Sequence, residues 1–275
     1  MRQDQINNES SFNKQEVLKQ MYSKQNLTQM TGSKGENDAA EQALMENIEK
    51  RNKLYKEGEV IPVVKEMSKK RKFIESLELI LKLNVDPTQG DQNIRGTCVL
   101  PAGTGKEVKI CVFANNEFHS DLEKAGADFI GTDKTIAAIG EGNIEFDKII
   151  ATPEFMPQLK ALARILGPKG LMPNLKSGTL VKGDELMEAV KLSKQGLIEF
   201  RVNESKYIMS KFGMRNFTDD SLFENLDALM KAIAKKKPES VKGKYFNSAA
   251  IKTSMGSPLK MDVNHYNTIA ATKQN

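Results

Sequence analysis

Two stretches rich in glycine and lysine have the residue types that bind phosphate groups. Residues 101–107 read PAGTGKE, and residues 167–179 read GPKGLMPNLKSGT. A phosphate cradle is built from backbone N–H groups at the start of a helix, with a lysine and a hydroxyl nearby. Such a site would bind a nucleotide and would make this chain a candidate enzyme.

Neither stretch meets the requirements of a phosphate cradle. In the first, position 100 is leucine instead of glycine, position 107 is glutamate instead of serine or threonine, and the next segment reads as a strand. The second follows a predicted helix, and its two prolines remove backbone donors. The residue chemistry favours a rigid turn with Leu171 and Met172 against a core. This turn comprises Gly167, Pro168, Lys169, Gly170 and Pro173.

Residues for metal binding and covalent catalysis are scarce. Cys98, Cys111, His119 and His265 are the only cysteines and histidines, and they have no C-x-x-C or H-x-x-x-H spacing. A Ser-His-Asp or Cys-His set can be assembled only by arbitrary long-range pairing. We therefore predict no catalytic residues, no metal site and no cofactor.

Positive charge is concentrated in two clusters. The net charge of +5 is modest, but SKKRK at 68–72 precedes a predicted strand and KKKPESVKGKY at 235–245 precedes the last strands. If both ends of the chain fold together, the clusters share a face suited to a folded RNA. A solvated helix end and a solvated loop explain them equally well.

The first 53 residues differ in composition from the rest of the chain. They are rich in Gln, Asn, Ser, Lys and Glu, and too poor in large apolar side chains to offset the entropy cost of ordering. We expect a flexible N-terminal extension at 1–53, with a short helix at EQALMENIEKRNKL. The extension lacks the apolar core of a secretory signal, and Asp4, Glu9 and Glu16 are unfavourable in a transit peptide. The sequence has no apolar run long enough to predict a membrane span.

The remaining chain shows three kinds of pattern. FIESLELILKLN alternates with a period of two, which favours a half-buried strand although its composition also allows a helix. IRGTCVLP and EVKICVFA read as a hairpin joined by AGTGK. Short helices and strands then alternate up to residue 195, as in a parallel sheet with crossover helices. Two antiparallel strands, LIEFRV and KYIMSKF, an amphipathic helix and final strands around NSAAIKTS and PLKMDVN follow; the helix has Leu222, Leu226, Leu229, Met230 and Ile233 on one side.

These patterns predict a split fold that combines α+β and α/β parts. Residues 54–102 plus 196–268 would form an α+β RNA-binding domain, with an inserted Rossmann-like α/β domain at 103–195 and a tail at 269–275. Two chain crossings would join the domains. Glycine permits the backbone changes that a hinge needs, so we predict hinge residues Gly103, Gly105, Gln195 and Gly196.

Several ordered motifs resemble one protein family. They are FIESLELILKLNVDPTQGDQNIRGTCVLPAGTGK, GADFIGTDK, FDKIIATPEFMPQLKALARILGPKGLMPNLKSGT, IEFR and KGKYFNSAAIKTSMGSPLKMD. From about Leu54 to Val263 the chain is similar to the universal large-ribosomal-subunit protein one family, the L-one proteins of the ribosomal stalk. The resemblance implies a non-enzymatic monomer within the ribosome, away from any membrane. Its implied partners are large-subunit rRNA at the mobile stalk, exit-site tRNA, whose release it assists, and other ribosomal components.

The resemblance also implies particular rRNA contacts. By position these are Lys72, Phe73, Ser76 and Glu78 on the first strand, and Ser248, Thr253, Ser254, Met255 and Gly256 near the end. Lysine would pair with phosphate, Phe and Met would supply apolar contact, hydroxyls would read ribose, and glycine would admit RNA to the backbone. Glutamate beside an anion would have to accept a hydrogen bond from a 2′-OH or a base amine. The chain has TSMGSP where relatives have Thr-Thr-Met-Gly-Pro, which puts individual contacts in question.

Two other functions and several locations remain open. A nucleotide-dependent enzyme would use the Rossmann-like insert, and a translational repressor would bind its own messenger off the ribosome. The long N-terminal extension and the Lys/Asn-rich, Arg-poor composition favour a mitochondrial ribosome in the matrix. Bacterial cytoplasm and plastid are the alternatives.

Overall fold

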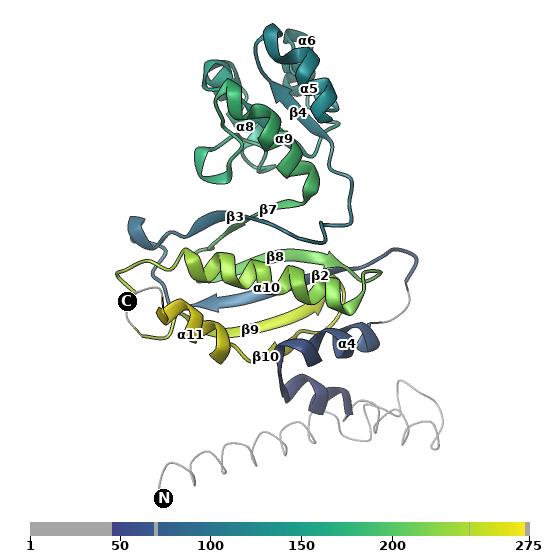
Figure 1. Cartoon of the computed structure of the whole chain (residues 1–275), viewed down its shortest axis with the longest axis vertical. Helices are drawn as coiled ribbons and strands as arrows, with labels where there is room; N and C mark the ends of the chain where they lie inside the picture. Colours follow the sequence, from purple (N-terminus) through teal and green to yellow (C-terminus); the bar gives the residue numbers. More distant parts are fainter. Residues whose placement is uncertain (1–45, 69–70, 242, 273–275) are drawn as a thin grey trace, which may run out of the picture. The chain divides into compact units, whose positions relative to one another are not determined.

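The computed structural model describes residues 46–68, 71–241 and 243–272 (Figure 1). The chain separates into two units, Met1–Lys53 and Leu54–Asn275. In the first unit, residues 46–52 are helical, within the predicted short helix. The rest of the predicted extension lies outside the described residues.

The main sheet is built from both ends of the second unit. Its order is β1-β10-β9-β2-β8, in which β1 pairs parallel with β10 and every other pair is antiparallel. The strands are β1 (Leu54–Tyr55), β2 (Ser76–Leu83), β8 (Tyr207–Met214), β9 (Phe246–Thr253) and β10 (Leu259–Met261). Alternate leucines of β2, from Leu77 to Leu83, are fully buried, which confirms the strand predicted from the period of two.

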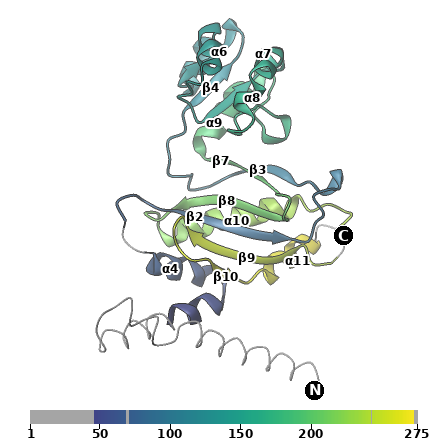
Figure 2. The ribbon, with the colours of Figure 1, turned by 180° about the vertical axis from the view of Figure 1, so that it is seen from behind.

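Three helices contribute side chains to the core of this sheet. They are α4 (Glu57–Met67), α10 (Asp219–Lys235) and α11 (Asn264–Thr272). The predicted apolar side of α10 is confirmed, because its five large side chains are all buried. The Thr218 hydroxyl accepts a hydrogen bond from the Ser221 N–H at 3.3 Å and caps the helix. Figures 1 and 2 show α10 and α11 on one face of the sheet.

The end of the chain differs from the prediction. Residues 269–272, predicted as part of a tail, belong to α11, in which Tyr266 and Ala270 are buried. The helix was missed because its polar start and small apolar residues give little periodic signal. Residues 273–275 lie outside the described residues.

The middle of the chain forms a separate parallel sheet with the order β5-β4-β6. The strands are β4 (Ile110–Phe113), β5 (Phe129–Ile130) and β6 (Lys148–Ala151); the helices are α5 (His119–Ala125), α6 (Asp133–Gly140), α7 (Met156–Ala161), α8 (Ala163–Leu166) and α9 (Leu186–Gln195). Neighbouring residues of β4 point into different apolar clusters, Ile110 and Val112 into one and Cys111 and Phe113 into the other. The fold is therefore mixed α/β with several sheets, as predicted.

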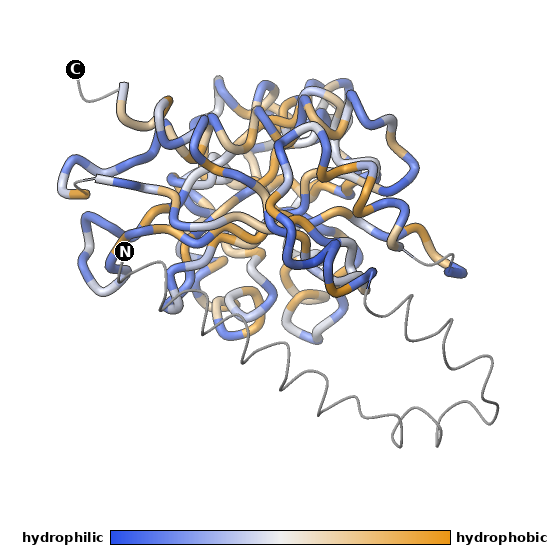
Figure 3. The backbone as a smooth tube through the Cα atoms, turned by 90° about the horizontal axis from the view of Figure 1, so that it is seen from below, coloured by the Kyte–Doolittle hydropathy of each residue, from blue (hydrophilic) through white to orange (hydrophobic). Residues whose placement is uncertain are grey.

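Short 3-10 helices and hydropathy complete this description. The 3-10 helices are η1 (Gly90–Gln92), η2 (Asn116–Phe118), η3 (Pro153–Phe155), η4 (Leu175–Ser177) and η5 (Gly183–Glu185). In Figure 3 the hydrophobic segments run through the interior of the view and hydrophilic turns lie around them. No helix within the described ranges is long and apolar enough to cross a bilayer.

The predicted hairpin around AGTGK is wrong. β3 (Arg95–Val99) pairs antiparallel with β7 (Leu197–Arg201), while β4 pairs only in the parallel sheet. The linking segment has positive φ at Gly103 (72°) and Gly105 (71°) and carries the chain from one sheet to another. Two adjacent β-rich runs with a glycine turn cannot reveal that the partner of β3 lies about a hundred residues later.

A buried carboxylate fixes the segment that leads into β2. Glu75 is only 2% exposed, the Nε of Arg71 lies 2.7 Å from its Oε1, and the Ser68 hydroxyl donates to its Oε2 at 3.0 Å. The Arg215 N–H donates to the Glu75 carbonyl oxygen at 2.9 Å. The pKa of Glu75 lies below its usual value because the Thr253 hydroxyl, with Ser68 and Arg71, outweighs the opposing effect of burial.

We expect Glu75→Gln to lower the free energy of unfolding by about 1–3 kcal/mol at pH 7, because it weakens charge-assisted hydrogen bonds in a buried site. The native pKa is below the ordinary 4.5, so this stabilisation is present above pH 4.5 and disappears as the pH falls through the native pKa. Urea unfolding of both proteins at several pH values measures the difference. The exposed Glu224→Gln in α10 is the matched control. An equal loss in that control, or a difference that grows on acidification, would contradict the assignment.

Candidate nucleic-acid interface

The face of the main sheet opposite α10 is polar and basic, and among the described residues no helix covers it (Figure 2). In the strand register Glu78 lies between Lys211 of β8 and Lys252 of β9. Two positions along β2, Ile80 lies opposite the 62%-exposed Met209. This face therefore combines cations with apolar contact area, as an RNA-binding sheet requires.

The far end of the same face has a lysine supported by an aromatic ring. Lys82 lies between Tyr207 and Ser248 in the register, and its Nζ is 5.7 Å from the centre of the Tyr207 ring. Ser248 is exposed beside it. A phosphate contact by Lys82 and a ribose contact by Ser248 are both geometrically available here.

The position of Glu78 is explained by an ion pair. Its Oε2 lies 3.1 Å from the Nζ of Lys252, and both side chains are about one-third exposed. Glu78 therefore orients a lysine on the face and offsets only part of its charge. Burial and the nearby Lys106 lower the pKa of Lys211, while Glu78 opposes this shift.

The start of β2 and the end of β9 are joined by two serines. The Ser254 N–H donates to the Ser76 carbonyl oxygen at 3.0 Å, and the two hydroxyl oxygens are 2.9 Å apart. Phe73 is 54% exposed three residues before this contact, and Met255 is 62% exposed one residue after it. This end of the sheet thus offers two apolar side chains and two hydroxyls within a few residues of one another.

Three predicted contacts need correction in their placement. Lys72 and Phe73 are exposed but precede β2, which begins at Ser76. Thr253 is fully buried, so it cannot itself contact RNA in this conformation. Its Oγ1 completes no hydrogen bond among the described residues, although the hydroxyl group lowers the pKa of Glu75.

Gly256 has a packing reason for being glycine. A Cβ at this position would lie 2.3 Å from Thr253 Oγ1, which is shorter than any real contact. The Gly256 N–H donates to the Thr253 carbonyl oxygen at 3.0 Å and closes the turn that carries Met255. Gly256 therefore lets the buried threonine and the exposed methionine occupy neighbouring positions.

The two basic clusters do not share one end of the sheet. β2 and β9 are antiparallel, with Leu77 opposite Thr253 and Leu83 opposite Phe246. Residues 68–72 lead to the first of these ends, whereas residues 235–245 lead to the second. Positions 69, 70 and 242 lie outside the described residues. The cations in the sheet register, Lys82, Lys211 and Lys252, were missed, although Lys82 has the same strand parity as Ser76 and Glu78.

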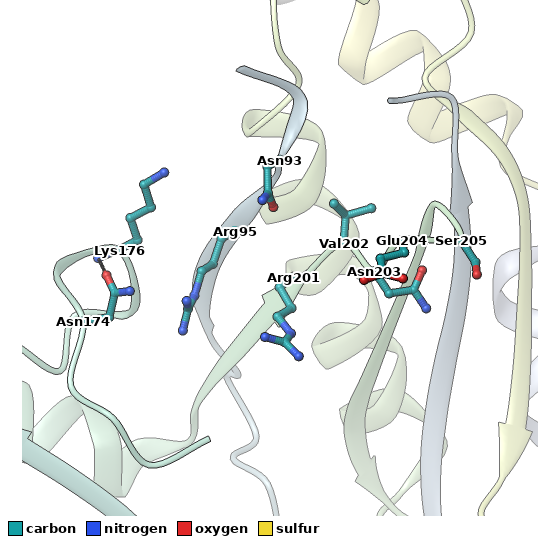
Figure 4. A pocket seen from close by; sticks show the side chains of 9 residues that line it. All are labelled: Asn93, Arg95, Asn174, Lys176, Arg201, Val202, Asn203, Glu204 and Ser205. Carbon is teal, nitrogen blue, oxygen red and sulfur yellow. Dashed lines mark hydrogen bonds between the residues drawn. The ribbon is translucent and has the colours of Figure 1, made fainter. Parts of the chain in front are cut away.

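A second cationic surface lies beside β3 and β7. A hollow of about 660 Å³ is lined by Arg95, Arg201 and Lys176, together with polar residues that include Asn93, Asn174 and Glu204 (Figure 4). Arg95 and Arg201 are opposite each other in the strand register, so they share a face. Arg95 pairs with Glu199, whereas among the described residues no carboxylate pairs with Arg201. Three cations against one lining carboxylate, that of Glu204, favour an anionic partner.

GPKGLMPNLKSGT forms a turn and not a phosphate cradle. The Asn174 side chain accepts from the Lys176 N–H at 2.9 Å, and the Ser177 and Thr179 hydroxyl oxygens lie 3.0 Å apart. Both hydroxyls are buried and bind within the loop. Gly170 has a positive φ of 70°, Pro173 is buried and Leu171 packs on a core cluster, so the segment forms a turn against the core. Lys176 remains at the edge of the cationic hollow.

The carboxyl ends of β4, β5 and β6, where α/β sheets bind nucleotides, are filled by aromatic side chains. Phe113 is fully buried, and its ring centre is 6.4 Å from that of Phe155. A Cβ on Gly131 would lie 2.1 Å from the Phe113 ring. PAGTGKE leads into strand β4 and not into a helix. The described residues contain no group of three metal-binding side chains, and both cysteines are buried thiols.

Comparison with known proteins agrees with this architecture. Residues 64–257 match the model of the Ribosomal protein L1p/L10e family. The chain is 44% identical over 220 residues to "Large ribosomal subunit protein uL1c" of Phaeodactylum tricornutum, covering 79% of this chain and 94% of that protein. It is 45% identical over 193 residues to the uL1c protein of Trieres chinensis, covering 70% and 83% of the two chains. It is 40% identical over 222 residues to "Large ribosomal subunit protein uL1" of Prochlorococcus marinus strain AS9601, covering 81% and 92%.

These relatives are chloroplast and cyanobacterial proteins. The mitochondrial form predicted from composition is therefore not supported, because codon-driven Lys/Asn enrichment does not distinguish one organelle from another. The chain matches the family model over more than half its length, and these relatives are 40–45% identical to it across most of their own length. This chain belongs to the Ribosomal protein L1p/L10e family.

Proposed function

We propose that this chain is a non-enzymatic structural component of the large ribosomal subunit and binds stalk rRNA through the open face of its main sheet. The observation that carries this proposal is the open face itself, on which three lysines share the strand register with exposed apolar and hydroxyl side chains. Relatives that the chain nearly spans are named large ribosomal subunit proteins. The messenger of the same chain, presenting a similar RNA element, is the second candidate ligand for this face.

The rRNA contacts divide by location. Phe73 and Met255 give apolar contact beside the two hydroxyls of Ser76 and Ser254. Lys72, Lys82 and Lys252 neutralise phosphate, and Ser248 contacts ribose. Glu78 orients Lys252, while Thr253 and Gly256 shape the turn from behind. The proposal thus keeps the predicted residues but gives three of them a supporting role.

The cationic hollow is the place proposed for the second RNA partner, exit-site tRNA. It lies beside η4 and the β3–β7 pair, on elements other than those of the open face.

The proposed domains are joined by a hinge. The α+β domain would comprise 54–102 and 196–268, with α11 completing it, and the α/β insert would comprise 103–195. Gly103, Gly105, Gln195 and Gly196 would form the hinge, and positive φ angles at the three glycines support this. Asn174 and Lys176 belong to the insert, whereas Arg95 and Arg201 belong to the α+β domain. Movement at the hinge would therefore widen or narrow the hollow and so accompany tRNA release.

The proposed location is a plastid ribosome, with bacterial cytoplasm as the alternative. Similarity to uL1c proteins supports it. Fractionation of a tagged protein measures this directly. Co-sedimentation with chloroplast ribosomes is expected, and recovery with mitochondrial ribosomes would overturn it.

Phe73→Ala and Met255→Ala should each weaken binding of stalk rRNA by about 1–3 kcal/mol, since each removes a contact comparable to base stacking. Filter binding at several salt concentrations measures the affinity and its salt dependence. Met187→Ala, a 40%-exposed methionine on α9, is the matched control and should leave affinity unchanged. Unchanged affinity in both test variants would discredit the surface. Nanomolar nucleotide binding without RNA binding would instead favour the enzyme.

Arg201→Ala with Lys176→Ala should weaken tRNA binding and lower its salt slope by about 2, because two phosphate contacts are lost. Affinity for stalk rRNA should be preserved. Competition assays with both RNAs on the same protein make the comparison, and Lys191→Ala, an exposed lysine of α9, is the control. A parallel loss of rRNA binding would show that the hollow is not a separate surface.

A further inference from the structure

One polar side chain in the main core lies where an apolar residue would be expected. Asn225 of α10 is fully buried among the leucines that pack on the sheet. Burial of an amide is unfavourable unless its hydrogen bonds are satisfied. The partners of Asn225 should therefore indicate what this residue is for.

Asn225 binds two segments that are far apart in the sequence. Its Nδ2 donates to the Phe212 carbonyl oxygen at 2.9 Å and to the Gly103 carbonyl oxygen at 3.1 Å. Its Oδ1 accepts from the Ala102 N–H at 2.9 Å. Phe212 lies in β8, next to Lys211 of the open face. One side chain thus connects the proposed rRNA-binding sheet to the first chain crossing.

The second crossing rests on the first. A Cβ on Gly196 would lie 2.8 Å from Gly103 Cα, and the Leu100 N–H donates to the Gly196 carbonyl oxygen at 3.2 Å. Gly196 has a positive φ of 112°, so an L side chain there would be strained as well as obstructed. Fixing Gly103 therefore also limits the positions open to Gly196.

Each crossing is tied to the parallel sheet by a lysine–aspartate pair. Lys106 lies 2.7 Å from Asp147 on the first crossing, and Lys194 lies 3.0 Å from Asp128 at the end of α9. Asp128 also accepts from the N–H of Ile110, the first residue of β4, at 2.9 Å. Little backbone is left to bend between these attachments. It comprises residues 104 and 105 in the first crossing and residues 195 and 196 in the second.

We propose that Asn225 is the positioning residue of the hinge: it anchors the crossings to the rRNA-binding sheet and confines bending to these few residues. The inference rests on the proposed hinge and explains how two flexible glycine crossings can hold Lys176 of the insert within a limited range of distances from Arg95 and Arg201. Without the amide, Ala102 and Gly103 lose their attachment and the bending segment becomes longer.

The test measures the distance between spin labels on the full chain. Labels at Lys260→Cys in β10 and Glu188→Cys in α9 use exposed positions, whereas native Cys98 and Cys111 are buried. We expect Asn225→Ala to widen the distance distribution at least two-fold and to speed exchange of the Ala102 amide at least ten-fold. Affinity for stalk rRNA should stay within two-fold. Asn143→Ala, an exposed asparagine, is the control.

The results test the role of Asn225 and the proposed hinge separately. An unchanged distribution in folded Asn225→Ala overturns the role of Asn225. If that variant does not fold, exchange in the unmodified protein decides: Ala102 should be protected as well as the α10 core, and exchange as fast as at the exposed Gly90 overturns the inference. Gly196→Ala should shift the mean distance. An unchanged mean distance in Gly196→Ala would contradict the proposed hinge position. The role of Asn225 is decided separately, by the distance distribution of Asn225→Ala.

Discussion

The antiparallel pairing of β2 with β9 is the interaction on which the rest of the structure depends. It joins Ser76 to Ser254, which are 178 residues apart in the sequence. Closing so long a loop is entropically costly, and eight-residue strands with fully buried leucines supply the compensating burial. Once these strands are paired, the intervening chain must leave the sheet and return to it. The β3–β7 pair is the consequence, since the outgoing and returning chains run side by side.

The same pairing leaves one face of the main sheet open to an RNA partner. α10 and α11 lie on one face, so the period-two alternation of β2 directs every second side chain to the other. Those positions hold Ser76, Glu78, Ile80 and Lys82. Fully apolar side chains there would have made an aggregation-prone surface, and fully charged ones would have repelled each other. The observed mixture gives a positively charged face on which the ion pair with Glu78 holds the side chain of Lys252 in place.

Local patterns predicted local structure well and long-range relations poorly. The period of two found β2, and the period of 3.6 found the five buried residues of α10. The AGTGK hairpin failed because strand pairing is a tertiary choice that adjacent sequence does not encode. The transferred contacts all lie on or beside the main sheet, but Thr253 is buried and Lys72 and Phe73 precede the strand. Asn225 was missed, although it lies three residues after Leu222 and four before Leu229 and so falls on the predicted apolar side of the helix.

The two motifs that resembled phosphate cradles owe their composition to backbone geometry. PAGTGKE needs glycine because Gly103 and Gly105 both have positive φ angles, and a Cβ on Gly105 would lie 2.8 Å from the Phe217 ring. GPKGLMPNLKSGT needs its hydroxyls for hydrogen bonds within the loop. Glycine, lysine and hydroxyl residues cluster in both kinds of site, because close backbone approach and tight turns require them as much as phosphate does. What separates the two is the following element. A helix would present a row of free N–H groups, whereas β4 uses its N–H groups in the sheet.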